Sequence, residues 1–255
     1  MRINNNLMAL NAHRQLGMNN IGQGKALEKL SSGLRINRAA DDAAGLSISE
    51  TMRGQIRGLQ QAQKNAQDGI SLIQTAEGAM NEISDMLVRM KELNVQKANG
   101  TYNTGDTDNI NAELAKLGEE IDSIKTNTKF NGKQLLTGGA VTLQLLDNGA
   151  GVAFSLAIVT GGWGSGTTLT DVEQAIKDVS TERAKLGAIQ NRLEHTVNNL
   201  GTTVENLQAS ESRIRDTDMA KEMMAFTKFN ILNQASTSML AQANQNPQSV
   251  LSLLR

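Results

Sequence analysis

In the stretch "IRGLQQAQKNAQDGISLIQTAEGAMNEISDMLVRM", residues 56–90, an apolar side chain recurs at almost every third or fourth position. This spacing keeps one face of an α-helix apolar over many turns. The pattern slips once, because the step from Ile73 to Ala76 is three residues where four is due. One helix from Ala44 to Gln96 would be about 80 Å long and would need partners along its whole length.

Two further segments have the same periodicity and are predicted to be those partners. The first carries five apolar residues at steps of four and three: Ile110, Leu114, Leu117, Ile121 and Ile124. The second runs from Leu193 to Ile214, with Glu211 as its single polar interruption. Steps of this kind are heptad seams. They predict a mainly α-helical fold, a long coiled-coil-like bundle.

The centre of the chain has a different pattern. In "VTLQLLDNGAGVAFSLAIV", residues 141–159, two alternating β-branched runs flank a turn segment, which predicts a small β-hairpin. "TGGWGSGTTLT", residues 160–170, lacks the Lys of a phosphate-binding loop, so we interpret it as an exposed loop that contains Trp163. Thr170, with Glu173 three residues later, is predicted to cap the next helix.

Both chain ends are predicted to be amphipathic helices that cannot bury their apolar stripes alone. The stripe residues are Ile3, Leu7, Leu10, Leu27 and Leu30 at one end, and Ile231, Leu232, Met239, Leu240, Val250, Leu251 and Leu254 at the other. Residues 229–254 contain no charged side chain, although 20% of the whole chain is charged. We therefore expect the two ends to pair.

Composition excludes several classes of function. A net charge of −1 offers no broad basic surface for nucleic acid, and without Cys there is no disulfide or thiolate metal site. The start lacks the continuous apolar segment of a Sec signal peptide, and no run of 18 apolar residues predicts a membrane helix. His13 and His195 lie outside any metal motif, and the adjacent Asp41 and Asp42 lack a His or Tyr. We predict no catalytic, metal-binding or cofactor-binding residues.

Several blocks resemble bacterial flagellin, in the order in which that family has them. The blocks are "LSSGLRINRAADDAAGLSISETMRGQIRGL" (30–59), "RMKELNVQKANGTY" (89–102), "FNGKQLL" (130–136), "LGAIQNRL" (186–193), "ESRIRDTDMAKEM" (211–223) and "ILNQASTSMLAQANQNPQSVLSLL" (231–254). The resemblance covers roughly residues 1–137 and 170–255. It implies a short flagellin without large outer domains, a structural subunit that self-assembles into the helical filament used for motility.

The resemblance also implies a division of the chain. Residues 1–33 and 216–255 would be the paired inner-tube helices, and 34–46 a linker fixed by charge pairs of Arg38, Asp41 and Asp42. Residues 47–170, with the hairpin near 141–159, would form the N-terminal part of an outer rod domain. Residues 171–215 would be the C-terminal helix of that rod.

The partners implied by the resemblance are other copies of the chain, a filament cap, hook-junction proteins and an export chaperone that binds the C-terminal segment. Arg89, Glu92, Leu93 and Gln96 match a region that a host innate immune receptor recognises, and the same face could instead pack between protofilaments. The protein would be secreted through the flagellar export apparatus to the extracellular flagellum. No nucleic-acid or membrane partner is expected.

Three alternatives are less favoured. A hook–filament junction protein shares the terminal helices, but the blocks at 89–100 and 244–255 favour flagellin. A membrane-surface binder would carry Lys and Arg on the polar face of its helix, and residues 229–254 have none. An enzyme would need a constellation of catalytic residues that the sequence lacks.

Overall fold

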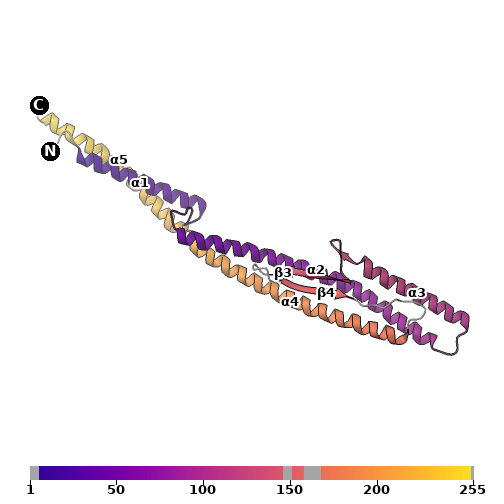
Figure 1. Ribbon diagram of the computed structural model, residues 1–255. Coiled ribbons are helices and arrows are strands. Elements are labelled where there is room, and N and C mark those ends of the chain that lie inside the picture. The colour runs from indigo at the N-terminus through magenta and orange to yellow at the C-terminus, as the bar shows by residue number, and fades with distance from the viewer. Residues whose placement is uncertain (1–5, 146–150, 158–167, 254–255) are drawn as a thin grey trace. The chain divides into compact units, whose positions relative to one another are not determined.

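The computed structural model describes residues 6–145, 151–157 and 168–253. The elements follow one another in the order α1 (Leu7–Ser32), α2 (Ala43–Lys97), α3 (Thr104–Asn127), β1 (Lys129–Phe130), β2 (Lys133–Gln134), β3 (Thr137–Gln144), β4 (Gly151–Ala157), α4 (Leu169–Arg215) and α5 (Met219–Leu253) (Figure 1). None of the described helices is long and apolar enough to cross a membrane. The prediction of a mainly helical fold with a small hairpin is confirmed.

The chain divides into two compact units. One comprises residues 1–54 and 206–255, and the other comprises residues 55–205. We call them the terminal unit and the bundle unit.

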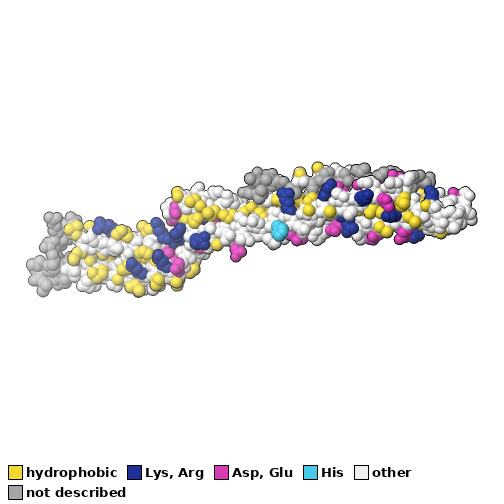
Figure 2. Space-filling model, turned by 90° about the horizontal axis from the view of Figure 1, so that it is seen from below, with side chains coloured by type: hydrophobic (Ala, Val, Ile, Leu, Met, Phe, Trp, Pro, Cys, Tyr) yellow, Lys and Arg dark blue, Asp and Glu magenta, His cyan; other side chains and the backbone are white. Residues whose placement is uncertain are grey.

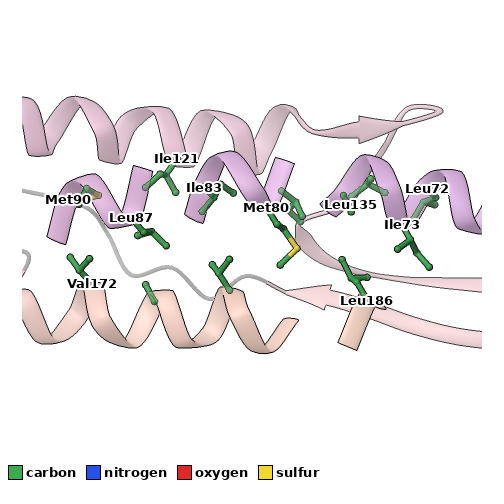
Figure 3. Close-up of a cluster of buried hydrophobic side chains, with 14 of the residues drawn as sticks. Leu72, Ile73, Met80, Ile83, Leu87, Met90, Ile121, Leu135, Val172 and Leu186 are labelled. Atoms are coloured by element: carbon green, nitrogen blue, oxygen red, sulfur yellow. The ribbon is translucent and has the colours of Figure 1, made fainter. Parts of the chain in front are cut away.

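The core of the bundle unit lies between α2, α3 and α4 (Figure 3). Met80, Ile83 and Leu87 of α2 are fully buried, and they face Ile121 of α3 and Leu186 of α4. The predicted slip in the α2 seam leaves no gap, because Ile73, Ala76 and Met80 are all buried. Aliphatic side chains therefore fill this core, as the heptad seams predicted.

Two antiparallel hairpins lie between α3 and α4 in the chain. β1 and β2 are joined by Asn131 and Gly132, whose φ angles of 48° and 79° match the turn that suits a tight hairpin. β3 pairs with β4 in a register that places Leu143 opposite Val152. Leu143 packs against Gly69 of α2 so closely that a Cβ at Gly69 would overlap it. The predicted hairpin near 141–159 is confirmed, whereas its turn and the loop with Trp163 lie outside the described residues.

The helix that follows begins two residues earlier than predicted. Thr168 and Asp171, rather than Thr170 and Glu173, form the reciprocal cap. The Thr168 N–H donates to Asp171 Oδ2 (3.0 Å), and the Asp171 N–H donates to Thr168 Oγ1 (3.3 Å). The Thr168 hydroxyl also lowers the pKa of Asp171. Glu173 instead forms an ion pair with Lys91 of α2 at 3.0 Å.

Candidate functional site

The candidate site is the helix pair formed by α1 and α5, which lie side by side in the terminal unit (Figure 1). The pair is antiparallel, because residues early in α1 contact residues late in α5. Among the described residues, the hydrogen bonds that cross it include Asn6 Nδ2 to the Ala243 carbonyl (2.6 Å), Asn19 Nδ2 to Ser236 Oγ (3.1 Å) and Asn233 Nδ2 to Gln23 Oε1 (2.6 Å).

Local chemistry sets the ends of α1. Asn6 caps its first turn by accepting a hydrogen bond from the Ala9 N–H at 3.1 Å. Gly33 ends the helix in the left-handed conformation, with φ of 72°, and its N–H binds the Lys29 carbonyl. The chain therefore turns directly after α1.

The covered face of α1 carries mainly small or polar side chains. Asn19 is 3% exposed and Ala26 is 1% exposed, and the half-buried positions include Ala9, Ala12 and Gly22. The ring of Phe229 lies directly over Gly22, where a Cβ would come within 2.6 Å of it. The most deeply covered positions of α1 are therefore small or polar, whereas Leu16 and Leu30 are half-buried.

Many large apolar residues of both helices are exposed to solvent. On α1 the exposed ones are Leu7 (61%), Met8 (70%), Leu10 (62%), Met18 (51%), Ile21 (65%) and Leu27 (55%). On α5 they are Met219, Met223, Met224, Ile231 and Met239. Hydrophobic side chains are accordingly spread over the visible surface of this unit (Figure 2). A self-sufficient helix pair would cover most of these residues.

A groove of about 440 Å³ runs between the two helices. Met8, Ala12, Leu232, Met239 and Ala243 contribute to its walls. Among its walls, Met8 of α1 and Met239 of α5 belong to the exposed apolar residues. We refer to these exposed residues and the groove together as the terminal apolar surface.

The predicted stripe residues divide into three groups. Leu7, Leu10, Leu27, Ile231 and Met239 are exposed on the terminal apolar surface. Leu30, Leu232 and Leu240 are half-buried. Ile3 and Leu254 lie outside the described residues, as do the side chains of Val250 and Leu251. Met8, Met18 and Ile21, which the sequence analysis did not name, belong to the same surface.

Asn19 was also missed. Its position in the sequence could have identified it, because Asn19 falls in the seam of small and apolar residues on α1, three positions after Leu16 and seven before Ala26. A polar residue at a seam position indicates a hydrogen-bonded contact across a helix pair. Its partner, Ser236, is 217 residues away in the chain.

The two segments that connect the terminal helices to α2 and α4 are joined to each other. Leu34 and Asp216 form a short antiparallel bridge, and the Arg35 N–H donates to the Arg215 carbonyl at 2.6 Å. The Arg215 guanidinium binds Glu50 at 2.9 Å, and this contact is the main reason that the pKa of Glu50 is lowered. The connections are therefore held by backbone pairing as well as by charge.

The linker residues make contacts different from the predicted charge pairs. Arg38 forms an ion pair with Glu28 of α1 (2.9 Å) rather than with Asp41 or Asp42. Asp41 Oδ2 accepts the N–H groups of Arg38 (3.1 Å) and Asn37 (3.2 Å), which lower the pKa of Asp41 in that order. Asp42 Oδ1 accepts a backbone N–H at the start of α2. Both carboxylates fix the turn through the backbone.

The predicted receptor or protofilament contact is only partly at the surface. Arg89 and Glu92 are exposed, and Arg89 binds Glu113 (3.0 Å) and Glu92 (3.2 Å). These contacts, Glu113 first, raise the pKa of Arg89. Gln96 is exposed and donates to the Tyr102 hydroxyl (3.1 Å). Leu93 is only 2% exposed and belongs to the core, because it lies on the inward face of α2.

Across the described residues, no group of three or more acidic, His or Cys side chains lies together in a way that could hold a metal ion.

Comparisons with known proteins agree with this architecture. Residues 3–141 match the bacterial flagellin N-terminal helical region, and residues 169–254 match the bacterial flagellin C-terminal helical region. The chain is 55% identical to a flagellin of Halalkalibacterium halodurans and 51% identical to a flagellin of Bacillus subtilis, with all of each chain covered. It is 48% identical to the flagellar filament 33 kDa core protein of Treponema phagedenis, again over the whole of both chains.

Among solved structures, the crystal structure of Bacillus cereus flagellin is 35% identical, with a TM-score of 0.48. It matches 54% of this chain and 88% of that one. The sequence matches cover both ends of the chain and nearly everything between them, and they confirm the resemblance drawn from the sequence blocks. The chain therefore belongs to the bacterial flagellin family, whose members are structural subunits of the flagellar filament.

Proposed function

We propose that the terminal apolar surface is the contact through which copies of this protein form the inner core of the filament. As a flagellin, the protein is a structural subunit that self-assembles into the extracellular flagellar filament. The proposal assigns that assembly to particular residues of α1 and α5.

One observation carries the proposal: both helices of the pair leave many large apolar side chains exposed, while the two fully buried residues of α1 are Asn19 and Ala26. Burying a Leu, Ile or Met side chain stabilises a structure by about 1.5–3 kcal/mol. Soluble monomers rarely expose such residues in a continuous patch, and a patch of this kind marks an interaction site. Leu7, Leu10, Ile21, Ile231 and Met239 all remain more than half exposed. A partner has to cover them.

The chemistry of this surface favours a second copy of the chain over a membrane. From Phe229 to its end at Leu253, α5 carries no charged side chain, so it lacks the Lys and Arg that would bind anionic lipid. Two copies can approach along this segment without repulsion between like charges. The large side chains then interdigitate in the way that heptad seams pack.

The remaining parts of the chain fit around this core. Residues 1–33 and 216–255 form the inner helices, residues 34–46 the linker, and residues 47–170 and 171–215 the outer rod. The uncharged polar side chains of α5 face the channel through which further subunits travel. The export apparatus secretes the chain, and the export chaperone binds the C-terminal segment through its exposed Met residues, in a helix-in-groove manner. The protein catalyses nothing.

Contacts with the filament cap and the hook-junction proteins use the same terminal helices. An innate immune receptor would bind the outer face of α2 through Arg89, Glu92 and Gln96. The ion pairs of Arg89 support this assignment because they hold the guanidinium in place on an exposed face.

Electron microscopy after salt-induced polymerisation tests the proposal. The full chain is compared with a chain that ends at Lys228 and so lacks most of α5. We expect filaments from the full chain alone. Equal polymerisation by both would contradict the assignment, whereas failure of the full chain even with filament seeds would favour a junction protein.

A further inference from the structure

We propose that two polar pairs in the covered interface, Asn19–Ser236 and Gln23–Asn233, set the register in which α1 and α5 pair, and thereby set the outer surface that the pair presents. We call them the register pairs. The register of the two helices is a property of the single chain. Only its effect on the contact between copies rests on the assembly role proposed above.

The register pairs lie in the covered interface between α1 and α5. Asn19 is 3% exposed, and Ser236, Gln23 and Asn233 are half-buried. The two hydrogen bonds lie about one helical turn apart on each helix, at 3.1 Å and 2.6 Å. They therefore bind two successive turns of α1 to two successive turns of α5.

The apolar part of the seam specifies the register only weakly. Ala12 and Ala243 lie seven residues from Asn19 and Ser236, one heptad along each helix, and both line the groove. Small side chains recur along this face of α1 at Ala12 and Ala26, so they do not interlock with α5 in the native register alone. Small side chains at such positions specify the register of a helix pair less sharply than large interlocking ones do. The Phe229 ring over Gly22 and the half-buried Leu16, Leu30, Leu232 and Leu240 add shape constraints.

The polar pairs distinguish between these registers. A slip of seven residues would place Asn19 opposite Phe229 or Ala243, and neither side chain can accept its hydrogen bond. Leaving a buried amide without a partner is costly, and this cost falls only on the slipped states. A single polar residue in a seam fixes the register of coiled coils in the same way.

The α1–α5 interface contains a polar group that lowers its stability. Among the described residues, Asn233 Oδ1 is buried without a hydrogen-bond partner. An apolar side chain of similar size at this position would avoid that cost, so the polar residue favours one pairing at the expense of overall stability.

The consequence for assembly is geometric. A slip of seven residues would shift α5 along α1 by about 10 Å, at 1.5 Å per residue. Ile231 and Met239 would then no longer stand beside the same residues of α1, and the terminal apolar surface would have a different shape. A neighbouring copy that fits the native surface would not fit the slipped one.

The test uses pairs of introduced Cys residues as disulfide reporters. The chain has no Cys of its own, so no native thiol can compete for the link. Ala12→Cys with Ala243→Cys reports the native register. Ala26→Cys with Glu222→Cys reports a slip of seven residues, and in the native register these two positions are staggered by about 10 Å, beyond the 7 Å reach of a disulfide. Neither reporter touches the register pairs. Each is oxidised in the full chain, both depolymerised and in filaments, and the intramolecular link is quantified by peptide mass spectrometry.

Each reporter is placed in three backgrounds. These are the native chain, a variant with apolar register positions (Asn19→Leu, Gln23→Leu, Asn233→Leu and Ser236→Ala), and a control with the same type of exchange at exposed positions (Asn20→Leu and Gln234→Leu). Links between copies migrate as dimers and are scored separately. Helix content, measured by circular dichroism, confirms that the terminal helices still form.

In the native chain and the control, we expect the native-register link to exceed the slipped link by at least about tenfold, because two hydrogen bonds are lost on slipping. In the apolar variant, that ratio should fall to about twofold or less, with helix content retained. A native ratio that persists in the apolar variant would overturn the inference. Failure of the native chain to polymerise would instead contradict the proposed assembly role, so the two failures are distinguishable.

Discussion

Replacing Ile231 by Ser tests the assembly surface at a single side chain. Ile231 is 61% exposed in the single chain. Complete burial of an Ile side chain stabilises by about 1.5–3 kcal/mol, so covering the part that is still exposed contributes roughly 1–2 kcal/mol to subunit addition. A change of 1.4 kcal/mol alters an equilibrium constant tenfold. The critical concentration for polymerisation should therefore rise about tenfold.

The assay measures the protein that stays soluble after filaments are pelleted, over a series of total concentrations. Thermal unfolding of the depolymerised chain should be nearly unchanged, within about 0.5 kcal/mol, because an exposed side chain contributes little to folding. Gln234→Ser, at an exposed polar position of α5, is the matched control and should leave the critical concentration unaltered. An Ile231→Ser chain that polymerises as readily as the control would refute the reasoning.

Three further changes probe other parts of the chain. Leu87→Ala opens a cavity at a fully buried position and should lower the free energy of unfolding of the bundle unit by about 3 kcal/mol, measured by urea denaturation. Gly22→Ala should weaken the α1–α5 pair by about 1–3 kcal/mol, because the added methyl group would collide with the Phe229 ring. The backbone amides of α1 should then be less protected from hydrogen exchange, and adding Phe229→Leu to the same chain should restore most of that protection. Because two backbone N–H groups hold the pKa of Asp41 below 3.8, the carboxylate stabilises the linker turn above that pH, and the stabilisation is lost as pH falls through the lowered pKa. Hydrogen exchange in the turn should show this acid transition, and Asp41→Asn should abolish it.

The bundle unit could be predicted from the sequence because its signal is long and repeated. In the seam with steps of four and three residues, Ile110, Leu114 and Ile121 are buried, and Leu117 and Ile124 are half-buried. Ends of elements were less certain, and the start of α4 shows why. Thr168 and Thr170 each have an acidic residue three positions later, so either could cap a helix, and only the path of the chain chooses between them.

The candidate site could be predicted only in outline. The apolar stripes on both terminal helices were visible, but the sequence did not show that α1 would turn Ala12 and Ala26 toward α5 and Leu7 and Leu10 toward solvent. That choice depends on which face the partner helix covers. Leu93 illustrates the same limit, because its neighbours Arg89 and Gln96 are exposed whereas Leu93 lies in the core.

The most direct test of the central claim is a cryo-electron microscopy map of the assembled filament at a resolution that shows side chains. The account predicts that Leu7, Leu10, Ile21 and Ile231 are buried against neighbouring copies, while Asn19 remains bonded to Ser236 within each chain. A filament in which these apolar side chains face water, and copies meet mainly through the bundle unit, would contradict the account.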